Sequence, residues 1–484
     1  MLNINLRPTQ LAFGDRQVHY AWVIVATAAL MRLSSSSFRT SSSILIPRLV
    51  ETFGWSYGMV GLAFSLQWVV SGMFGTPAGW LGDRYGVRVT MVIGAVLFVA
   101  GMVLTATVNS LWEFYLYFGI VLSAAMGIFQ VPLTAGVTQW FHRQLGVGMG
   151  VLQASQGLGP LVAVPIILFI IAVFSGEPGW WVGWIPGIES FFGDEEKGLR
   201  ASFWIPGILG GVLLLGLVRL FYNEPASLGL RPLGMSADEP VRQLQSGDAA
   251  KTRSKIFLRQ VLPTTAFWNL IGIHYWGCAG HAIVMVYIVA MAEEAGVPKG
   301  LAAGTFIALT VTSTLTRFAV PILADHLGSK GVMGVCFFLQ VAPVFLLFFA
   351  DTAWMFYLFA ILFGIGFGGE MTAFPIINRQ YYGNAPIGTT YGFQMMGAGF
   401  GMASGAAIGG LLRDLTEGFS YPAFVNSGDF TATVAASLVL SALGVVSIAL
   451  LPNTGHHQLP HWEDALPDEY RSNPQSSRAP SAGD

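Results

Sequence analysis

Charge and cysteine are scarce in this sequence. Charged residues make up 10% of its 484 residues and hydrophobic residues 54%, whereas soluble globular chains have about 25% charged residues. The formal net charge of −2 offers no basic surface to a nucleic acid. The two cysteines, Cys278 and Cys336, lie within apolar runs, which favours small buried side chains over a disulfide framework. Neither a soluble domain nor a disulfide-stapled one is expected.

Long apolar runs are what the sequence has instead. Runs of about 18 or more residues can cross a bilayer core as helices, and backbone in lipid must be helical because no water bonds its polar groups. We expect twelve spans, at about 20–45, 58–80, 89–109, 112–138, 146–174, 201–222, 263–292, 300–323, 331–350, 353–376, 388–412 and 431–451. The first run continues past signal-peptide length without a cleavage site, so it counts as the first span.

The spans divide the chain into five parts. A cytoplasmic N-terminus (1–19) precedes a first six-span bundle (20–222), and a polar central cytoplasmic loop (223–262) joins it to a second bundle (263–451). The cytoplasmic tail (452–484) is rich in Pro, Ser, Asp and Glu. Such a composition predicts disorder.

Lysine and arginine are distributed unevenly between the two sides of these spans. With both termini in the cytoplasm, 16 of the 24 Lys and Arg residues lie on the cytoplasmic side, as expected for a cell-membrane protein under the positive-inside rule. The outer loop 175–200 contains three tryptophans. It is typical of an interfacial aromatic belt, and the alternative is a lid over the outer mouth.

A short polar motif occurs twice. Gly79 to Arg88 reads GWLGDRYGVR, and Pro321 to Lys330 reads PILADHLGSK, at an offset of 242 residues. In this register Asp83 aligns with Asp325, and Gly86 aligns with Gly328. Each copy lies between the second and third spans of its six-span half. The repeat indicates an internal duplication. Glycine permits a tight bend, and Asp83 is placed to accept bonds from the N-terminal amides of a neighbouring helix.

The motif resembles the signature G-x-L-x-D-R-x-G-x-R of the major facilitator superfamily. The matching positions are Gly79, Leu81, Asp83, Arg84, Gly86 and Arg88. The resemblance covers the chain from Tyr20 to Leu451 and implies an all-α polytopic membrane protein, with twelve transmembrane helices in two pseudo-symmetric six-helix bundles around a cavity that opens alternately to each side. It also implies that these residues, with Asp325 and Gly328, form a gating motif. Because Ala324 and His326 depart from the signature, a weaker lock is expected in the second half.

A narrower resemblance is to the monocarboxylate and oxalate–formate transporters, bacterial type. Three segments are similar to that branch: the first span with its closing FGWS at 53–56, TQWFHRQLGVGMGVLQASQGLG at 138–159, and FGIGFGGEMTAF at 363–374. The resemblance implies a small organic anion as substrate.

Arg317 lies in the eighth span with hydroxyl side chains on its own helical face, at Ser313, Thr314 and Thr310. A buried guanidinium is costly in a membrane, and its planar fork matches a carboxylate. In monocarboxylate transporters an arginine eight residues before the turn binds the substrate carboxylate, as Arg317 stands to Asp325. Animal members couple protons through an Asp four residues before that arginine, where this chain has Ser313.

Arg32 and Arg39 in the first span lie seven residues apart and share a helical face. Either is a candidate second ligand for substrate or a gating residue. The alternative is that one of them pairs with Glu370 or extends toward the surface. Tyr391 and Gln394 are further candidate donors to substrate. The second cationic ligand of the oxalate–formate exchangers is missing, because no Lys or Arg lies between Gly388 and Leu411.

Glu370, His274 and His281 are candidates for proton coupling, since a buried carboxyl and histidine can both titrate near neutral pH. A structural role is the favoured alternative, with Glu370 paired to a basic group such as Arg379 and the histidines satisfied within the bundle.

These features predict a secondary active transporter of a small organic anion, most simply a monocarboxylate, with a co-transported proton as a candidate partner and the lipid bilayer as its surroundings. The rivals are a carrier of an uncharged or drug-like solute, in which Arg317 is structural, and a non-transporting membrane sensor. The sequence has no metal-ligand spacing such as H-E-x-x-H and no phosphate loop, so we expect neither an enzyme nor a cofactor. Nothing in the sequence indicates an oligomeric state.

Overall fold

A computed structural model of the chain describes residues 11–13, 16–41, 45–176, 192–236, 247–422, 425–455 and 457–471. In these ranges twelve helical segments are long and apolar enough to cross a membrane. The predicted polytopic all-α fold is therefore confirmed. The described residues add one small feature that the sequence did not suggest, an antiparallel hairpin of β1 (Leu11–Phe13) and β2 (Arg16–Val18) ahead of the first span.

The first bundle contains six spans. They are α1 (Tyr20–Ser41), α3 (Tyr57–Tyr85), α4 (Val87–Ala106), a continuous run of α5 (Leu111–Phe114), a π-helical segment (Tyr115–Leu122) and α6 (Ser123–Thr138), then α7 (Leu145–Phe174) and α8 (Glu195–Val218). The short α2 (Ile46–Phe53) stands between α1 and α3.

The second bundle repeats this plan. Its spans are α10 (Thr265–Glu294), α11 (Lys299–Leu327), α12 (Ser329–Val344) with a 3₁₀ turn (Phe345–Phe348), α13 (Ala353–Glu370) continued by α14 (Phe374–Tyr382), α15 (Gly388–Leu415) and α16 (Thr431–Ala449).

Local sequence signals fix several helix ends. The Ser56 hydroxyl caps α3 by accepting from the Met59 amide at 3.2 Å. Gly86 and Gly328 end α3 and α11 with the same φ of +90°, a conformation that strains any residue with a Cβ. The two copies of the repeated motif therefore make the same turn, which supports the predicted duplication.

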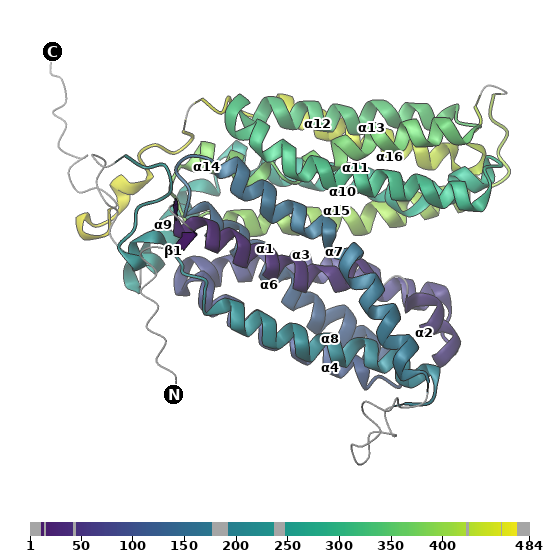
Figure 1. Cartoon of the computed structure of the whole chain (residues 1–484). Helices are drawn as coiled ribbons and strands as arrows, with labels where there is room; N and C mark the ends of the chain where they lie inside the picture. Colours follow the sequence, from purple (N-terminus) through teal and green to yellow (C-terminus); the bar gives the residue numbers. More distant parts are fainter. Residues whose placement is uncertain are drawn as a thin grey trace.

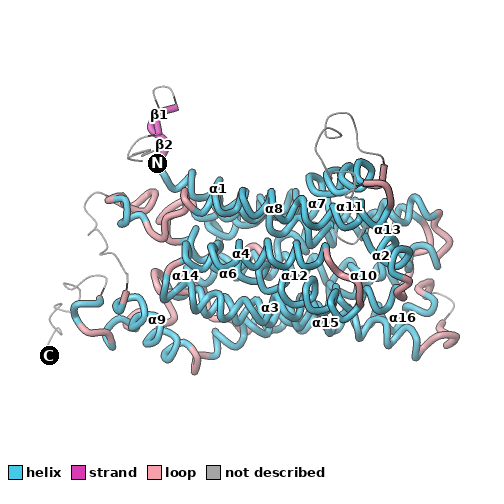
Figure 2. Tube along the Cα trace, turned by 90° about the horizontal axis from the view of Figure 1, so that it is seen from below, coloured by secondary structure: helices cyan, strands magenta, loops and turns pink. Residues whose placement is uncertain are grey.

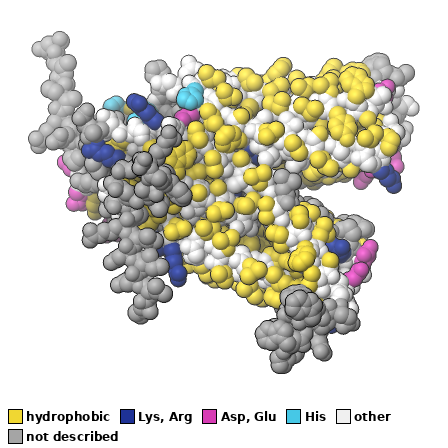
Figure 3. All heavy atoms as spheres, viewed as in Figure 1, with side chains coloured by type: hydrophobic (Ala, Val, Ile, Leu, Met, Phe, Trp, Pro, Cys, Tyr) yellow, Lys and Arg dark blue, Asp and Glu magenta, His cyan; other side chains and the backbone are white. Residues whose placement is uncertain are grey.

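The long helices of both bundles run nearly side by side, and the hairpin and α9 lie at one end (Figures 1 and 2). Between the bundles, α3 packs along α15 and α7 along α11. The bundles meet at the end that bears α9 and α14, and a wedge opens between them toward the end that bears α2 (Figure 3). We call these the α9 end and the α2 end.

On the side of the molecule that Figure 3 shows, the surfaces of both bundles are largely apolar. Large side chains such as Phe169, Leu209, Leu315 and Val335 are 60–69% exposed. Patches of this extent are a liability in water and are expected of helices that face lipid.

The central loop includes one regular helix. It contains the helix α9 (Asp248–Val261), which buries Arg253, Ser254, Phe257 and Val261. These residues recur at helical spacing, so a polar helix with one packed face forms within this polar stretch. Residues 237–246 lie outside the described residues.

The prediction of a disordered tail is wrong for residues 452–471, except that residue 456 lies outside the description. Trp462 is 5% exposed, packs on the Phe257 ring at 5.2 Å and lies under the Arg253 guanidinium at 4.8 Å. Arg253 also forms an ion pair with Glu463 at 2.6 Å. A few apolar residues and one ion pair therefore hold the tail on α9. Residues 472–484, and residues 177–191 of the tryptophan-rich loop, are outside the described residues, so the choice between belt and lid stays a prediction.

Candidate substrate cavity

A cavity of about 220 Å³ lies between the two bundles, and its lining comes from α3, α6 and α7 on one side and α10, α11, α13 and α15 on the other. Most of the lining is apolar, including Trp68, Phe306, Phe367, Met285, Met371, Met395 and Met402. Its polar members include Gln130, Gln156, His281, Ser313, Thr314 and Arg317. A small, largely apolar cavity with a few convergent polar groups is the usual form of a ligand site.

Arg317 reaches this cavity from α11. Its Nε donates to the Ser313 hydroxyl one turn earlier, at 3.3 Å, and its guanidinium lies over the Phe367 ring at 5.1 Å. Among the described residues, its one hydrogen bond is this one, and none reaches its two terminal nitrogens. Thr310 and Thr314, the other hydroxyls on this face, bond to carbonyls of their own helix. Arg317 is thus oriented through Nε, and no described residue takes up its other donors.

The first bundle bonds both terminal nitrogens of Arg32, while its buried Nε has no hydrogen-bond partner among the described residues. One terminal nitrogen donates to the side-chain oxygens of Gln153 (3.1 Å) and Gln156 (3.3 Å), and the other donates to the Gln130 carbonyl (2.9 Å) and the Thr134 hydroxyl (2.6 Å). The side chain is 1% exposed and does not line the cavity. The suggested pairing of an arginine with Glu370 is therefore wrong for Arg32, whose charge is surrounded by neutral acceptors.

The other predicted substrate residues fall into two groups. Arg39 lies on α1, but its side chain is outside the described residues, so its role stays a prediction. Tyr391 and Gln394 are buried on α15 and do not line the cavity. Gln394 exchanges two hydrogen bonds with Asn378 on α14, at 2.9 and 3.1 Å. The structure thus brings Arg317 and Ser313 to the cavity and leaves Tyr391 and Gln394 behind its wall.

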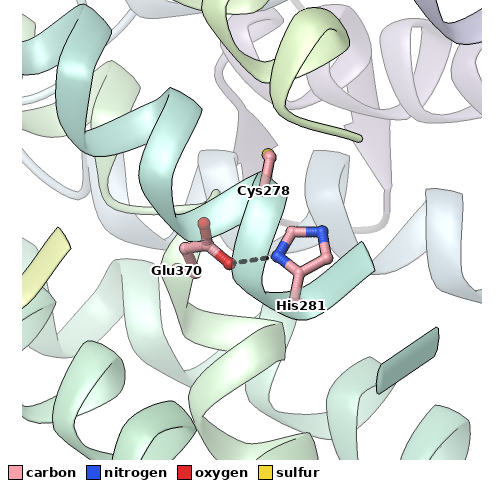
Figure 4. Close-up of side chains that lie close together, drawn as sticks. All are labelled: Cys278, His281 and Glu370. Carbon is pink, nitrogen blue, oxygen red and sulfur yellow. Dashed lines mark hydrogen bonds and ion pairs between the residues drawn. The ribbon is translucent and has the colours of Figure 1, made fainter. Parts of the chain in front are cut away.

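Glu370 and His281 form a buried pair beside the cavity (Figure 4). His281 Nδ1 lies 2.8 Å from Glu370 Oε2, which also accepts from the Gln340 amide at 2.7 Å. His281 lines the cavity and Glu370 does not. The predicted pairing of Glu370 with Arg379 is wrong, because Arg379 donates to the Thr138 hydroxyl on the first bundle.

Cys278 joins this pair to make a set of three potential metal ligands (Figure 4). Its sulfur, a nitrogen of His281 and an oxygen of Glu370 all lie within 4.8 Å of one another. These donor types suit Zn²⁺. However, the imidazole and the carboxylate already contact each other directly at a hydrogen-bond distance, which leaves no place for an ion between them.

His274 has different surroundings from His281, although both lie on α10. Its ring stacks on Phe374 with centroids 3.6 Å apart, and neither ring nitrogen has a hydrogen-bond partner in the described structure. The suggested relay between the two histidines therefore has no hydrogen-bonded path among the described residues.

The repeated turns lock the bundles together at the α9 end. Asp83 accepts three hydrogen bonds from the start of α15, from the amides of Gly388 (3.0 Å) and Thr389 (2.7 Å) and from the Thr389 hydroxyl (2.8 Å). This confirms the predicted contact of Asp83 with helix N-terminal amides. Gly79 is needed here, because a Cβ at this position would overlap the Gly388 carbonyl.

The second copy makes the mirror contact with a single bond. Asp325 accepts from the Gly146 amide at the start of α7, at 2.9 Å. Gly146 and Gly388 are themselves separated by the repeat offset of 242 residues. The weaker lock expected from the second motif therefore has a geometric counterpart.

The basic residues of the first motif lie beside the turn. Arg84 stacks over the Trp80 ring at 4.5 Å and Arg88 lies 5.8 Å from the Tyr222 ring. The Arg88 amide donates to the side chain of Asn223, which lies directly against Gly86. These contacts join the turn to the segment that follows α8.

Sequence reasoning missed the aromatic and amide residues that organise the site. Phe367 contacts both Arg317 and His281, the latter with ring centroids 4.7 Å apart, and Gln340 holds Glu370. Phe367 lies three residues before Glu370 on α13, on the same helical face. That spacing was the available signal, but Gln340 had none because its helix is distant in sequence.

Two pseudo-symmetric bundles of membrane helices, locked at one end and enclosing a largely apolar cavity with a few polar groups, have the architecture of a membrane transporter. The sequence profile of the Major Facilitator Superfamily matches residues 28–329 and 277–467. The chain belongs to this family, and it is a transporter and not an enzyme.

Individual relatives are distant but cover most of the chain. The oxalate:formate antiporter of Oxalobacter formigenes is 23% identical over 402 residues, which span 80% of this chain and 84% of that protein. Monocarboxylate transporter 2 of Mesocricetus auratus is 22% identical over 445 residues, covering 89% and 85%.

Two solved structures show the same fold. FucP, a Major Facilitator Superfamily transporter in the outward conformation, aligns with a TM-score of 0.63 at 16% identity, covering 89% of this chain and 99% of that one. The proton:xylose symporter XylE aligns with a TM-score of 0.66 at 15% identity, covering 92% and 98%.

Proposed function

We propose that this protein is a secondary active transporter that moves a small organic anion, a monocarboxylate, by alternating access. The observation on which the proposal rests is Arg317, which lines the cavity and whose one hydrogen bond among the described residues is made by Nε, not by its terminal nitrogens.

The chemistry of Arg317 suits a carboxylate. A guanidinium presents two parallel N–H donors that match the two carboxylate oxygens, and hydrogen bonds to charged groups contribute about 1.5–3 kcal/mol each. The bond to Ser313 and the Phe367 ring hold the guanidinium in one orientation. Less conformational freedom is then lost when the anion binds.

The walls suit an acid with one carboxylate and a short apolar body. A volume of about 220 Å³ is below the range of about 300–1,000 Å³ typical of sites for drug-sized ligands. A second carboxylate would need a second free cation. Arg32 does not provide one, because it does not line the cavity and its terminal nitrogens donate to neutral acceptors of the first bundle. Arg39 remains the candidate second ligand.

The two aspartate locks suit alternating access. The bonds from Asp83 to α15 and from Asp325 to α7 hold the α9 end shut while the α2 end is open. Opening the α9 end requires both to break, with Arg84 and Arg88 beside the first of them. The distribution of Lys and Arg assigns the α9 end and both termini to the cytoplasm, so the described conformation faces outward.

The distant relatives support an anion as the cargo. One is an oxalate:formate antiporter and another a monocarboxylate transporter. The rival carrier of an uncharged solute requires a structural partner for Arg317, and no described residue forms an ion pair with it. A sensor would bind the acid without moving it.

The test is uptake of labelled acids into proteoliposomes that contain the purified full-length protein. The panel comprises lactate, pyruvate, formate, oxalate, glycolate and short branched acids, with the methyl ester of each acid as a neutral competitor. We expect saturable uptake of at least one monocarboxylate that its ester does not inhibit. Uptake of neutral solutes alone, or binding of an acid without flux, would contradict the proposal.

A further inference from the structure

We propose that the exposed face of α9 binds the headgroups of anionic phospholipids in the leaflet next to the α9 end. This inference goes beyond transport and does not depend on the proposed cargo. It starts from three basic residues of the helix. Lys251, Lys255 and Arg259 follow one another at intervals of four residues and are all exposed, so they share one side of the helix. We call these three residues the basic stripe.

The opposite side of α9 is buried. Arg253, Phe257 and Val261 also recur every four residues, and each lies two positions after a member of the basic stripe. Two positions correspond to about 200° of rotation in an α-helix. The buried residues and the basic stripe therefore lie on opposite sides, and docking of one side presents the other.

Contacts on the buried side fix the rotation of α9 about its own axis. The Phe257 ring packs on Trp462 of the tail and on Tyr382 of α14, with ring centroids 5.2 and 5.5 Å away. Arg253 forms its ion pair with Glu463 at 2.6 Å. Because these partners belong to the tail and the second bundle, the basic stripe cannot turn inward unless those contacts break.

The basic stripe carries charge that the described structure leaves unpaired. Lys251 forms an ion pair with Asp248 at 3.3 Å, and its amine lies 5.7 Å from the Tyr85 ring. Asp248 is the one acidic residue of α9. Among the described residues, the side chains of Lys255 and Arg259 have no ion pair or hydrogen bond. Two free cations in a row favour an anionic partner.

The position of α9 favours a lipid surface over a dissolved anion. The helix lies at the ends of the long helices (Figures 1 and 2), and three residues separate its last residue, Val261, from the start of α10 at Thr265. Trp268, in the first turn of α10, is 58% exposed, and its indole nitrogen donates to the Leu262 carbonyl. An exposed tryptophan at the end of a span lies typically at headgroup level. The C-terminal turn of α9, with Arg259, is therefore close to that level.

The chemistry of the basic stripe suits a phosphate-bearing headgroup. Arginine can bond two phosphate oxygens at once, and lysine supplies a point charge. Anionic lipids are concentrated in the cytoplasmic leaflet, and each Lys or Arg near that surface strengthens the attraction about fivefold. This agrees with the proposed cytoplasmic location of the α9 end.

The experiment uses purified full-length protein in phosphatidylcholine vesicles that contain a minority of photoactivatable phosphatidylglycerol. The crosslinked peptides are mapped by mass spectrometry. The variant Lys255→Gln/Arg259→Gln removes the two unpaired charges and no buried contact. The control Arg219→Gln/Lys299→Gln removes the same charge at two exposed residues elsewhere. We expect the yield at residues 248–268 to fall about 25-fold in the variant, from two residues at about fivefold each, and to stay unchanged in the control.

Three results would overturn the inference. The first is an unchanged yield at residues 248–268 in the folded variant. The second is an equal fall in the control, which would reflect net charge and not the basic stripe. The third needs no variant and covers one that does not fold: a wild-type map in which phosphatidylglycerol labels other segments of the α9 end but not this one.

Competitors distinguish a lipid from other anionic partners. Soluble glycerol phosphate represents a free phosphate and polyglutamate an acidic protein, both added at constant ionic strength. We expect neither to lower the yield at residues 248–268. A loss with either would assign the basic stripe to a dissolved anion or to an acidic protein and contradict the lipid. Since no step requires transport, failure of the carrier proposal would leave this result unaffected.

Discussion

Each bundle buries one described arginine near the centre of the membrane, but the two are treated in opposite ways. The first bundle surrounds Arg32 with the side chains of Gln153, Gln156 and Thr134, so the charge is anchored within the scaffold. The second bundle holds Arg317 by a single hydrogen bond, from Nε to Ser313, and by the Phe367 ring. The comparison teaches that burial of a cation in a membrane protein does not define its role. The partners do.

Loss of Arg317 should have the largest effect on transport. Arg317→Gln removes the proposed fork for the carboxylate, and two hydrogen bonds of about 1.5 kcal/mol each correspond to a fall of about 100-fold in kcat/KM. Arg317→Lys should retain part of the rate, since the charge remains. Uptake kinetics with matched protein amounts measure this, and thermal unfolding should change little. Wild-type kinetics in Arg317→Gln would show that Arg317, like Arg32, is structural.

Loss of Arg32 should affect stability more than binding. Arg32→Gln leaves buried acceptors without donors, each at a cost of about 1–3 kcal/mol. We expect a lower Tm in a thermal-unfolding assay, while the KM of the fraction that folds changes by only a few fold. The assignment of a structural role to Arg32 and a binding role to Arg317 would be refuted if Arg32→Gln kept the wild-type Tm but lost binding of the acid.

The two aspartate contacts between the bundles differ in their number of hydrogen bonds, and this difference gives a further test of how the two halves compare. Asp83 accepts three hydrogen bonds across the bundles and Asp325 accepts one. Asp83→Asn should therefore shift the population toward opening of the α9 end more than Asp325→Asn. Spin-label distances across that end, recorded for both variants, report the shift. Equal shifts would indicate that the turns, and not these bonds, set the equilibrium.

The smallest effect is expected at His19, at the edge of the first bundle. Its Nδ1 accepts from the Ala21 amide and its Nε2 bonds the Arg231 carbonyl. Burial lowers the pKa of His19, and the bond to Arg231 partly opposes this. Because the pKa of His19 is lower in the folded state, neutral His19 stabilises the fold at pH values above its unfolded pKa of about 6.5. This stabilisation is lost as the pH falls through the folded pKa. His19→Gln should slightly reduce the loss of Tm on mild acidification. An unchanged pH dependence would show that another group is responsible.

The sequence was sufficient for features that repeat or recur locally. Apolar run length predicted the spans, and the duplicated motif predicted the two bundles and the contact of Asp83 with helix amides. The cavity residues Arg317 and Ser313 followed from one helical face. Partners from distant helices could not be predicted, because Gln394 and Asn378, or Glu370 and Gln340, are brought together only by packing. The tail was misjudged because the contribution of Trp462 is invisible in its average composition.

The most direct test of the account is equilibrium binding of the best-transported labelled acid to purified protein, with wild type, Arg317→Gln and Arg32→Gln measured side by side. The account predicts saturable binding to wild type and to the folded fraction of Arg32→Gln, competed by the free acid and not by its methyl ester, and binding about 100-fold weaker to Arg317→Gln. Wild-type affinity in Arg317→Gln would contradict it.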